Sequence, residues 1–237
     1  MGAAADIKSD VQAILDAPWA RRKGQVVPTT ESVALRNGAV DLDAVVLYAD
    51  LAHSTQLARK FALTTAAKVV RAYLSTMTRL IRFHGGEVRS FDGDRVMGVF
   101  LGDAKNSNAG RCALRMNWAM REVLRPKVAA KFPVLSQKGF QLTHCVGIHA
   151  SSILVVRGGI RANNDLVFVG EGPNLAAKLS DQRASPYHAY ITHTVYGRLN
   201  EAAKLKEASG PNMWQQVYVT MAGERWQCYR SNWWWSP

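Results

Sequence analysis

The chain has few cysteines, and they form no recognisable pattern. Cys112, Cys145 and Cys228 are the three cysteines among 237 residues, and their spacing matches no metal-binding motif. An odd number of cysteines also argues against a disulfide framework. Reduced thiols in a reducing compartment are the simpler interpretation.

Long apolar runs are also missing. No uninterrupted apolar segment reaches the roughly 20 residues that a membrane-spanning helix needs. The first 16 residues carry Asp6, Lys8, Asp10 and Asp16, so they lack the apolar core of a secretory signal. The sequence has no internal repeat and no low-complexity region. We therefore expect a soluble, cytoplasmic protein that does not contact a membrane.

Positive charge is what the chain has in excess. Thirty Lys and Arg residues against eighteen Asp and Glu give a net charge of +12. Such a surface attracts polyanions such as nucleic acids, anionic membranes or nucleoside triphosphates, although a solvated basic surface without a specific partner explains the charge equally well. The composition, with 48% hydrophobic residues, is that of a globular protein of one large domain, with or without extensions.

The first 38 residues are expected to form an N-terminal arm, followed by one domain over residues 39–237. Val11, Ile14 and Leu15 have helical spacing, which predicts a short amphipathic helix. The cationic segment 19–23 is expected to end this helix, because positive charge suits a helix C-terminus. Such an arm packs on its own domain or on a partner chain more often than it binds phosphate.

Strand and helix patterns alternate after the arm. We expect, in order, a strand over 44–49, a helix over 64–83 that stops at 84–86, a hairpin of 87–91 and 95–100, a helix over 103–124, and strands over 140–149 and 153–156. Ser54 or Thr55 is expected to cap the helix after the first strand. This order predicts an α+β, ferredoxin-like fold with an antiparallel central sheet flanked by helices.

Breaker residues guide the rest of the prediction. Two prolines indicate a connection over 125–138, and 157–164 is expected to be a flexible basic loop. The remaining elements are expected to be a strand over 165–169, a helix that begins at 170–173, a strand over 190–193, a helix over 195–204 and a closing hairpin of 213–218 and 225–230. The three tryptophans at 233–235 should bury against the domain or a second subunit.

Two aspartates come close together in this arrangement. Asp50 follows the first strand, and Asp94 follows the Asp92-Gly93 pair, which predicts a tight hairpin turn. If the hairpin pairs beside that strand, the two carboxylates repel each other unless they share a proton or a divalent cation. We interpret them as a Mg²⁺ or Mn²⁺ site. Alone, Asp50 would be a helix-capping residue and Asp94 a turn residue.

Five motifs in sequence resemble the class III nucleotidyl cyclases. They are Tyr48-Ala49-Asp50-Leu51, His84-Gly85-Gly86-Glu87, Gly93-Asp94-Arg95-Val96-Met97, Gly147-Ile148-His149, and the stretch from Val169 to Leu179. The resemblance covers about residues 43–200 and agrees with that family's order of strands and helices. It implies a head-to-tail homodimer with two active sites at the subunit interface.

The resemblance also implies a specific chemistry. Asp50, Leu51 and Asp94 match the metal-binding positions, with two Mg²⁺ or Mn²⁺ ions in each active site. One cation would activate the ribose 3′-hydroxyl for attack on the α-phosphorus, with loss of pyrophosphate. Main-chain N–H groups at the start of a helix would bind the phosphates of the substrate. These N–H groups belong to Leu51, Ala52, His53, Ser54 and Thr55.

Asn174 and Lys178 match the family's transition-state pair, which the other subunit supplies. They lie four residues apart, on one helix face. The family usually has arginine at the second position, and lysine keeps the charge but loses the bidentate fork. Arg183 is one residue that could supply the missing contact. An exposed helix face is the alternative interpretation of the pair.

The positions that read the base in adenylyl cyclases differ here. The resemblance places the adenine-reading lysine at Ser90 and its partner at Val167. Neither side chain makes the usual purine hydrogen bonds, and a site that reads a base needs complementary donors and acceptors. Tyr48, Arg89 and Phe91 could narrow the pocket around a smaller base. Tyr48 is the best candidate for a base contact, and a core strand tyrosine is its alternative.

This pattern looks like the pyrimidine, or uridylate, cyclases of bacterial anti-phage systems. The resemblance implies conversion of UTP to 3′,5′-cyclic UMP and pyrophosphate, as a signal in anti-phage defence. It favours UTP over CTP, although the residues themselves do not decide between them. A cytidylate or adenylate cyclase, and a degenerate domain that binds nucleotide without turnover, are the alternatives.

An RNA-binding ferredoxin-like domain would also explain the positive charge. Such domains present aromatic side chains on the sheet for base stacking. The hairpin strand 95–100 lacks the Arg/Lys-Gly-Phe type of pattern. We therefore expect no stable binding of nucleic acid.

Overall fold

The apolar run that ends at Asp50 forms the centre of the sheet. In the computed structural model, which describes residues 2–237, this run is strand β2 (Gly38–Leu51). It lies between β4 (Arg95–Phe100) and β5 (His144–Ile160) and is antiparallel to both. The run is apolar without alternation because both faces of β2 are covered.

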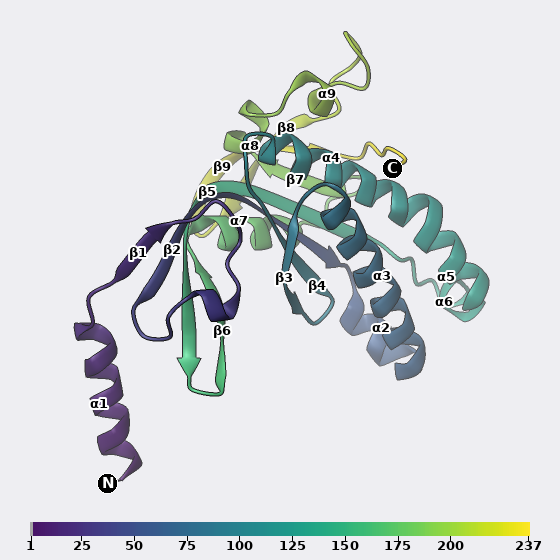
Figure 1. The fold of residues 1–237 in the computed structure, drawn as a ribbon. Coiled ribbons are helices and arrows are strands. Elements are labelled where there is room, and N and C mark those ends of the chain that lie inside the picture. The colour runs from purple at the N-terminus through teal and green to yellow at the C-terminus, as the bar shows by residue number, and fades with distance from the viewer. Residues whose placement is uncertain (1) are drawn as a thin grey trace.

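Within residues 2–237 the sheet has nine strands and is mixed. The other strands are β1 (Ala20–Lys23), β3 (Glu87–Asp92), β6 (Asn163–Val169), β7 (Ala189–Thr192), β8 (Gln215–Met221) and β9 (Glu224–Ser231). Their order is β3-β4-β2-β5-β7-β9-β8, with β1 beside β2 and β6 beside β5 (Figure 1).

The prediction of an antiparallel central sheet is right for β3-β4-β2-β5 and wrong for two pairs. β1 is parallel to β2, and β7 is parallel to β5. Helix α7 (Glu171–Ser180) begins near Ser151 of β5 and ends near Cys145. It thus returns the chain to the level at which β5 starts, so the next strand, β7, runs in the same direction as β5.

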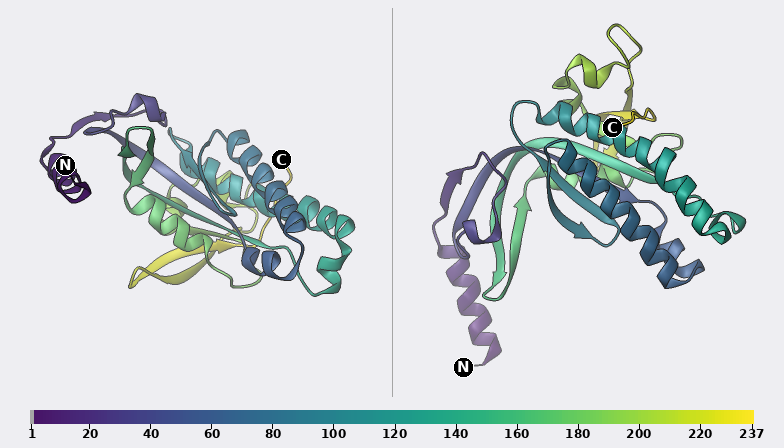
Figure 2. Two further views of the ribbon diagram at one scale, coloured as in Figure 1. Left: turned by 90° about the horizontal axis from the view of Figure 1, so that it is seen from below. Right: turned by 45° about the vertical axis from the view of Figure 1, so that its right-hand side comes forward.

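Helices cover both faces of the sheet. The helices of the chain besides α7 are α1 (Ala3–Asp16), α2 (Ser54–Lys60), α3 (Leu63–Phe83), α4 (Lys105–Trp118), α5 (Arg125–Lys131), α6 (Pro133–Gln137), α8 (His193–Gly197) and α9 (Glu201–Lys204), with short helical turns η1 (Thr30–Ser32) and η2 (Ala119–Leu124). Figure 2 shows α3 and α4 on one side of the sheet and α7 on the other. The odd-numbered residues of β2 from 45 to 51 pack with α3 and α4, whereas Ala44 and Val46 pack with Ala176 of α7. Asp50 and Tyr48 therefore face the α7 side.

The connection predicted over 125–138 is helical instead. Pro133 occupies the first turn of α6, where a missing N–H costs nothing, and Pro126 is the second residue of α5, directly after the π-helical turn η2. The helix predicted over 103–124 is α4 followed by the π-helical turn η2, and it runs directly into α5. The prolines therefore mark helix starts rather than a loop.

The two strands predicted over 140–149 and 153–156 are one strand, β5. The polar pair Ser151-Ser152 does not interrupt it, because both residues pair with β2. The flexible loop predicted over 157–164 is also wrong, since these residues form the end of the hairpin between β5 and β6. Pairing between β5 and β6 holds residues whose own propensity is that of a loop.

Several other predictions are confirmed. Helix α3 stops at His84, and Gly85 has the positive φ expected there. The hairpin of β3 and β4 and the closing hairpin of β8 and β9 both form. The helix predicted over 195–204 is split into α8 and α9, because Asn200 starts a new helix by accepting a hydrogen bond from Ala203 N.

The N-terminal helix is present but ends earlier than predicted. α1 stops at Asp16 because Pro18 follows, and a residue before proline disfavours the helical conformation. The cationic segment 19–23 contains β1, paired with β2, instead of a helix end. No residue of α1 is buried in this protomer, and the helix extends away from the sheet (Figure 1).

The C-terminal tryptophans are covered unequally. Trp233 and Trp235 pack half-buried against the main core, whereas Trp234 is 39% exposed. The guanidinium of Arg121 lies 3.7 Å from the centre of the Trp234 ring. Among the described residues, no helix is long and apolar enough to cross a membrane.

His149 on β5 is expected to make the fold sensitive to acid. Its Nδ1 lies 2.9 Å from Thr192 Oγ1, and burial lowers the pKa of His149 from 6.5 to about 4. The unfolded chain therefore binds a proton that the folded chain does not. The contribution to stability is complete above pH 6.5 and is lost toward pH 4, by up to ~3 kcal/mol. We expect His149→Asn, which cannot titrate, to flatten this loss in urea unfolding at several pH values.

The exposed His193 provides the control for this experiment. His193→Asn should leave the pH dependence of the unfolding free energy as in the wild type. The same loss between pH 6.5 and pH 4 in His149→Asn would refute the assignment, whatever the absolute stability of that variant.

Candidate active site

The structure brings the two predicted aspartates together at the end of β2. Asp50 is 5% exposed and pairs with Arg95 of β4, and Leu51 N donates to the main-chain oxygen of Asp94, at 3.4 Å. Burial raises the pKa of the Asp50 carboxyl, and the negative charge of Asp94 raises it further. The predicted hairpin thus places two carboxyl groups close enough to influence each other.

Two arginines bind the Asp50 carboxylate. Arg95 Nε donates to Oδ1 at 3.2 Å, and Arg183 donates to Oδ2 from the loop after α7. Arg95 also donates to Asp181, at 2.6 Å. These guanidiniums oppose the effect of burial on the pKa of Asp50. A cation that binds Asp50 would have to share or replace these contacts.

The donors at this position suit a hard cation. Carboxylate and main-chain oxygens are the ligands that Mg²⁺ and Mn²⁺ prefer. In the described part of the chain, no three His, Cys, Asp or Glu side chains are grouped closely enough to hold a metal. A cation held by Asp50 and Asp94 would therefore need other oxygens, and Mg²⁺ commonly takes these from water and substrate phosphates.

The turn after Asp50 differs in detail from the prediction. Leu51 N and Ala52 N already donate to Asp94 O and Thr143 O, so they are not available to phosphate. The N–H groups that remain are those of His53, Ser54 and Thr55. Neither Ser54 nor Thr55 caps α2 as predicted. His53 occupies the cap position with φ +64° and no side-chain hydrogen bond, because the sharp turn out of β2 needs a left-handed residue.

A row of side chains lies beside the aspartates on the same face. Tyr48 pairs with Met97 of β4, and Met97 pairs with Ser90 of β3. The Tyr48 hydroxyl donates to Met97 Sδ at 3.2 Å. Since residues two apart on a strand share a face, Tyr48 and Asp50 point to the same side. Phe91 pairs with Val96, which is buried under α3, so Phe91 lies on the opposite face.

Three predicted site residues lie away from Asp50 within one protomer. Val167 pairs with Val156, which pairs in turn with Ala39 of β2. Ala39 precedes Asp50 by eleven residues, or about 36 Å along the strand. Asn174 and Lys178 are exposed on α7 and line a shallow cavity with Asp181, Glu224 and Trp226.

Sequence reasoning missed two residues of the site. Arg95 and Asp181 form an ion-pair chain with Asp50, and neither was singled out. The sequence did contain a signal for Arg95, because this residue directly follows Asp94 and therefore starts the strand that pairs with β2 at Asp50. Asp181 had none, since only the packing of α7 brings it there.

Comparisons with known proteins agree with the fold and extend it. No protein-family model matches the chain. A protein of Rhodovulum sp. (strain MB263) named uridylate cyclase is 41% identical over 98% of this chain and 97% of its own length. A uridylate cyclase of Xanthomonas perforans is 36% identical over 99% of both chains. The crystal structure of the guanylyl cyclase Cya2 superposes with a TM-score of 0.66 over 81% of this chain and 92% of that chain, at 20% identity.

Proposed function

This chain belongs to the uridylate cyclases and is a nucleotidyl cyclase, and on that premise we propose that it converts UTP to 3′,5′-cyclic UMP and pyrophosphate. The observation that carries the proposal is the pair Asp50 and Asp94 at the end of β2, with Tyr48 beside it on the same face. The names of the relatives support uracil as the base. The anti-phage role that the resemblance implies stays a prediction.

Asp50, Asp94 and the Leu51 carbonyl would hold Mg²⁺ or Mn²⁺, with two ions in each active site. Bound there, the cations would activate the 3′-hydroxyl and neutralise charge on the triphosphate. The position of Asp94 beside the buried Asp50 supports this assignment, because the charge of Asp94 disfavours a negative charge at Asp50 unless a cation compensates it, and a metal ion could take over that part from Arg95 and Arg183.

Arg183 and Arg95 give the same protomer two cations for the triphosphate. Both bind Asp50, one to each carboxylate oxygen. If Asp50 turns to a metal ion, these guanidiniums become free to donate to phosphate oxygens, which arginine binds in bidentate form. Arg183 would then compensate for the lysine at position 178, where the family usually has arginine.

The base would lie along the row of Tyr48, Met97 and Ser90. Tyr48 is half-buried, and burial raises the pKa of its hydroxyl, so the group stays protonated and can donate. A pyrimidine is smaller than a purine and presents one carbonyl or amino group at C4. A hydroxyl donor beside that group favours the carbonyl of uracil. Phe91, on the opposite face, has no part in this pocket.

The residues that complete the site would come from a second copy of the chain. Val167 lies about 36 Å along the sheet from the level of Asp50, so one copy cannot bring both to one nucleotide. Asn174 and Lys178 are exposed and point away from the sheet that carries Asp50. In a two-fold homodimer, each copy would place these side chains beside the aspartates of its partner, so the dimer would have two complete active sites.

Competition among ATP, GTP, CTP and UTP tests the substrate. With Mn²⁺ and equal concentrations of the four nucleotides, we expect cyclic UMP as the main product, identified by mass. Tyr48→Phe removes the donor but keeps the ring, so it should reduce the preference for UTP over CTP by roughly tenfold, the value of one hydrogen bond in a buried site.

Ser152→Ala is the matched control, because Ser152 lies on β5 far from Asp50. It should leave the product ratio unchanged. Cyclic CMP as the main product would support the cytidylate alternative, and cyclic AMP would reject a pyrimidine pocket. No cyclic product from any nucleotide would support the degenerate, nucleotide-binding alternative.

A further inference from the structure

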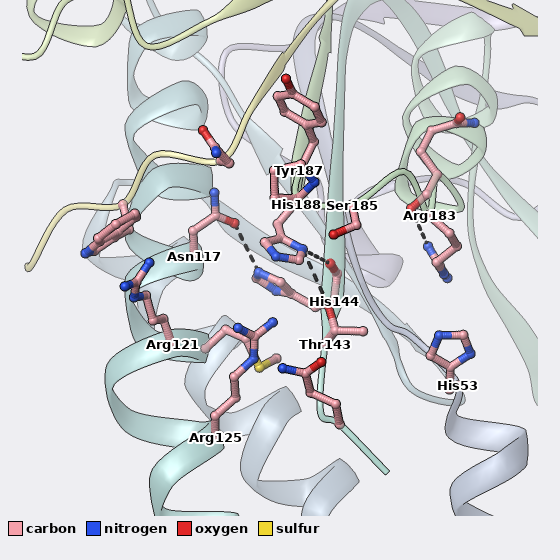
Figure 3. A pocket seen from close by; sticks show the side chains of 16 residues that line it. His53, Asn117, Arg121, Arg125, Thr143, His144, Arg183, Ser185, Tyr187 and His188 are labelled. Carbon is pink, nitrogen blue, oxygen red and sulfur yellow. Dashed lines mark hydrogen bonds between the residues drawn. The ribbon is translucent and has the colours of Figure 1, made fainter. Parts of the chain in front are cut away.

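A cavity of about 420 Å³ lies at the end of the sheet where β5 begins, and most of it is on the side of α4. Two of its lining residues, His53 and Arg183, also border the active site. Figure 3 shows its side chains, which come from α4, η2, the start of β5 and the loop before β7. Its basic residues include Arg121, Arg125, His144 and His188. None of the lining residues, all within the described chain, is an aspartate or glutamate.

The pleat of the sheet separates most of this cavity from the aspartates. On β5, Cys145 pairs with Asp50, whereas His144 pairs with Leu51. Neighbouring residues on a strand point to opposite faces, so His144 faces α3 and α4. Its Nε2 lies 3.1 Å from Asn117 Oδ1 of α4. The guanidinium of Arg183, at the edge of the cavity, is bound to Asp50 instead.

The cavity suits an anion, because its arginines are fixed in position and no acidic side chain lines it within the described chain. Arg121 pairs with Glu122, at 3.1 Å, but Glu122 does not line the cavity. Arg125 Nε donates to Leu142 O at 2.7 Å, and Arg121 is held over Trp234. Burial lowers the pKa of Arg125, and the charge of Arg121 lowers it further. His144, 2% exposed, has its second ring nitrogen without a hydrogen-bond partner. An anion would relieve this repulsion.

We propose that this cavity binds a small phosphate-bearing molecule through Arg121 and Arg125, which take no part in the active site around Asp50 and Asp94. Two arginines held side by side are suited to the oxygens of a phosphate group. The volume lies in the range of small-molecule sites. Asn117, Gln141 and Tyr187 also line the cavity and would contact the rest of a nucleotide-sized ligand. The site does not depend on which nucleotide the enzyme cyclises.

Calorimetric titration tests this proposal with inorganic phosphate, UMP and cyclic UMP as probes. EDTA should be present so that divalent cations do not support binding at the aspartates. We expect saturable binding of at least one probe to the full-length protein. Arg125→Gln should weaken it roughly tenfold or more, because a charge-assisted contact is lost. Equal affinity for all three probes would identify free phosphate as the ligand, and preference for UMP or cyclic UMP would identify a nucleotide.

Three variants make the result decisive. Arg121→Gln changes a side chain that is half exposed, so it should fold normally and weaken binding as Arg125→Gln does. Arg79→Gln, an exposed arginine on α3, and Asp94→Asn, in the active site, should both leave the affinity unchanged. Absence of binding by the wild type, or loss of binding in Asp94→Asn but not in Arg121→Gln, would overturn the proposal.

Discussion

Asp50→Asn is expected to lower the turnover number of the cyclase by roughly a thousandfold, because a metal-assisted attack depends on several kcal/mol of charge stabilisation. Asparagine keeps the shape of the side chain but offers one neutral oxygen in place of a carboxylate. Asp94→Asn should have an effect of the same order. The measurement is the initial rate of cyclic nucleotide formation with saturating Mn²⁺, with the product quantified by mass.

The loss must come from chemistry and not from misfolding. In Asp50→Asn the amide oxygen would accept from one of the two arginines, and the other guanidinium would turn to the solvent that it already reaches in part, so the variant should stay folded with a modestly lower melting temperature. Asp43→Asn is the control, because Asp43 lies on the same strand and its carboxylate is paired with Lys105. It should retain wild-type turnover. More than a tenth of wild-type turnover in a folded Asp50→Asn variant would contradict the assignment of Asp50 as a metal ligand.

The centre of the site could be predicted from sequence because local signals determine it. A short uninterrupted apolar run is typical of a strand covered on both sides, and Asp92-Gly93 favours one kind of turn. Together they place Asp94 beside Asp50, as the structure has it. The stop of α3 at His84 follows from glycine in the same way.

The remainder of the fold depends on contacts between distant segments. Gly158 and Gly159 favour a loop, yet pairing with β6 makes them part of a strand. Pro126 and Pro133 suit both a loop and a helix start, and only the packing of the helices decides between the two. Asp181 reaches Arg95 because α7 packs closely on β5. The helix lies so near Gly147 that a side chain at this position would have no room. Such tertiary effects leave no periodic signal in the sequence.

Mixing two inactive variants is expected to restore activity if the active site is shared between two copies. Asp50→Asn lacks the proposed metal ligand, and Asn174→Ala lacks the group that would come from the partner. In a mixed dimer, one site has both defects, while the other has Asp50 from one chain and Asn174 from the other. After subunit exchange of equal amounts, half of the dimers are mixed, so the rate should recover to about one quarter of the wild-type rate.

This recovery distinguishes the shared site from a site within one chain. If Asn174 acted on Asp50 of its own chain, every site in the mixture would keep one defect, and activity would stay at the level of the separate variants. Asp50→Asn mixed with Asp94→Asn is the internal control, because both aspartates lie in the same chain and no dimer made from these two variants contains an intact site. Sedimentation must show dimers in each sample. Monomers with full wild-type activity would reject the shared site, since exposed Asn174 and Lys178 on α7 could then act only within their own chain.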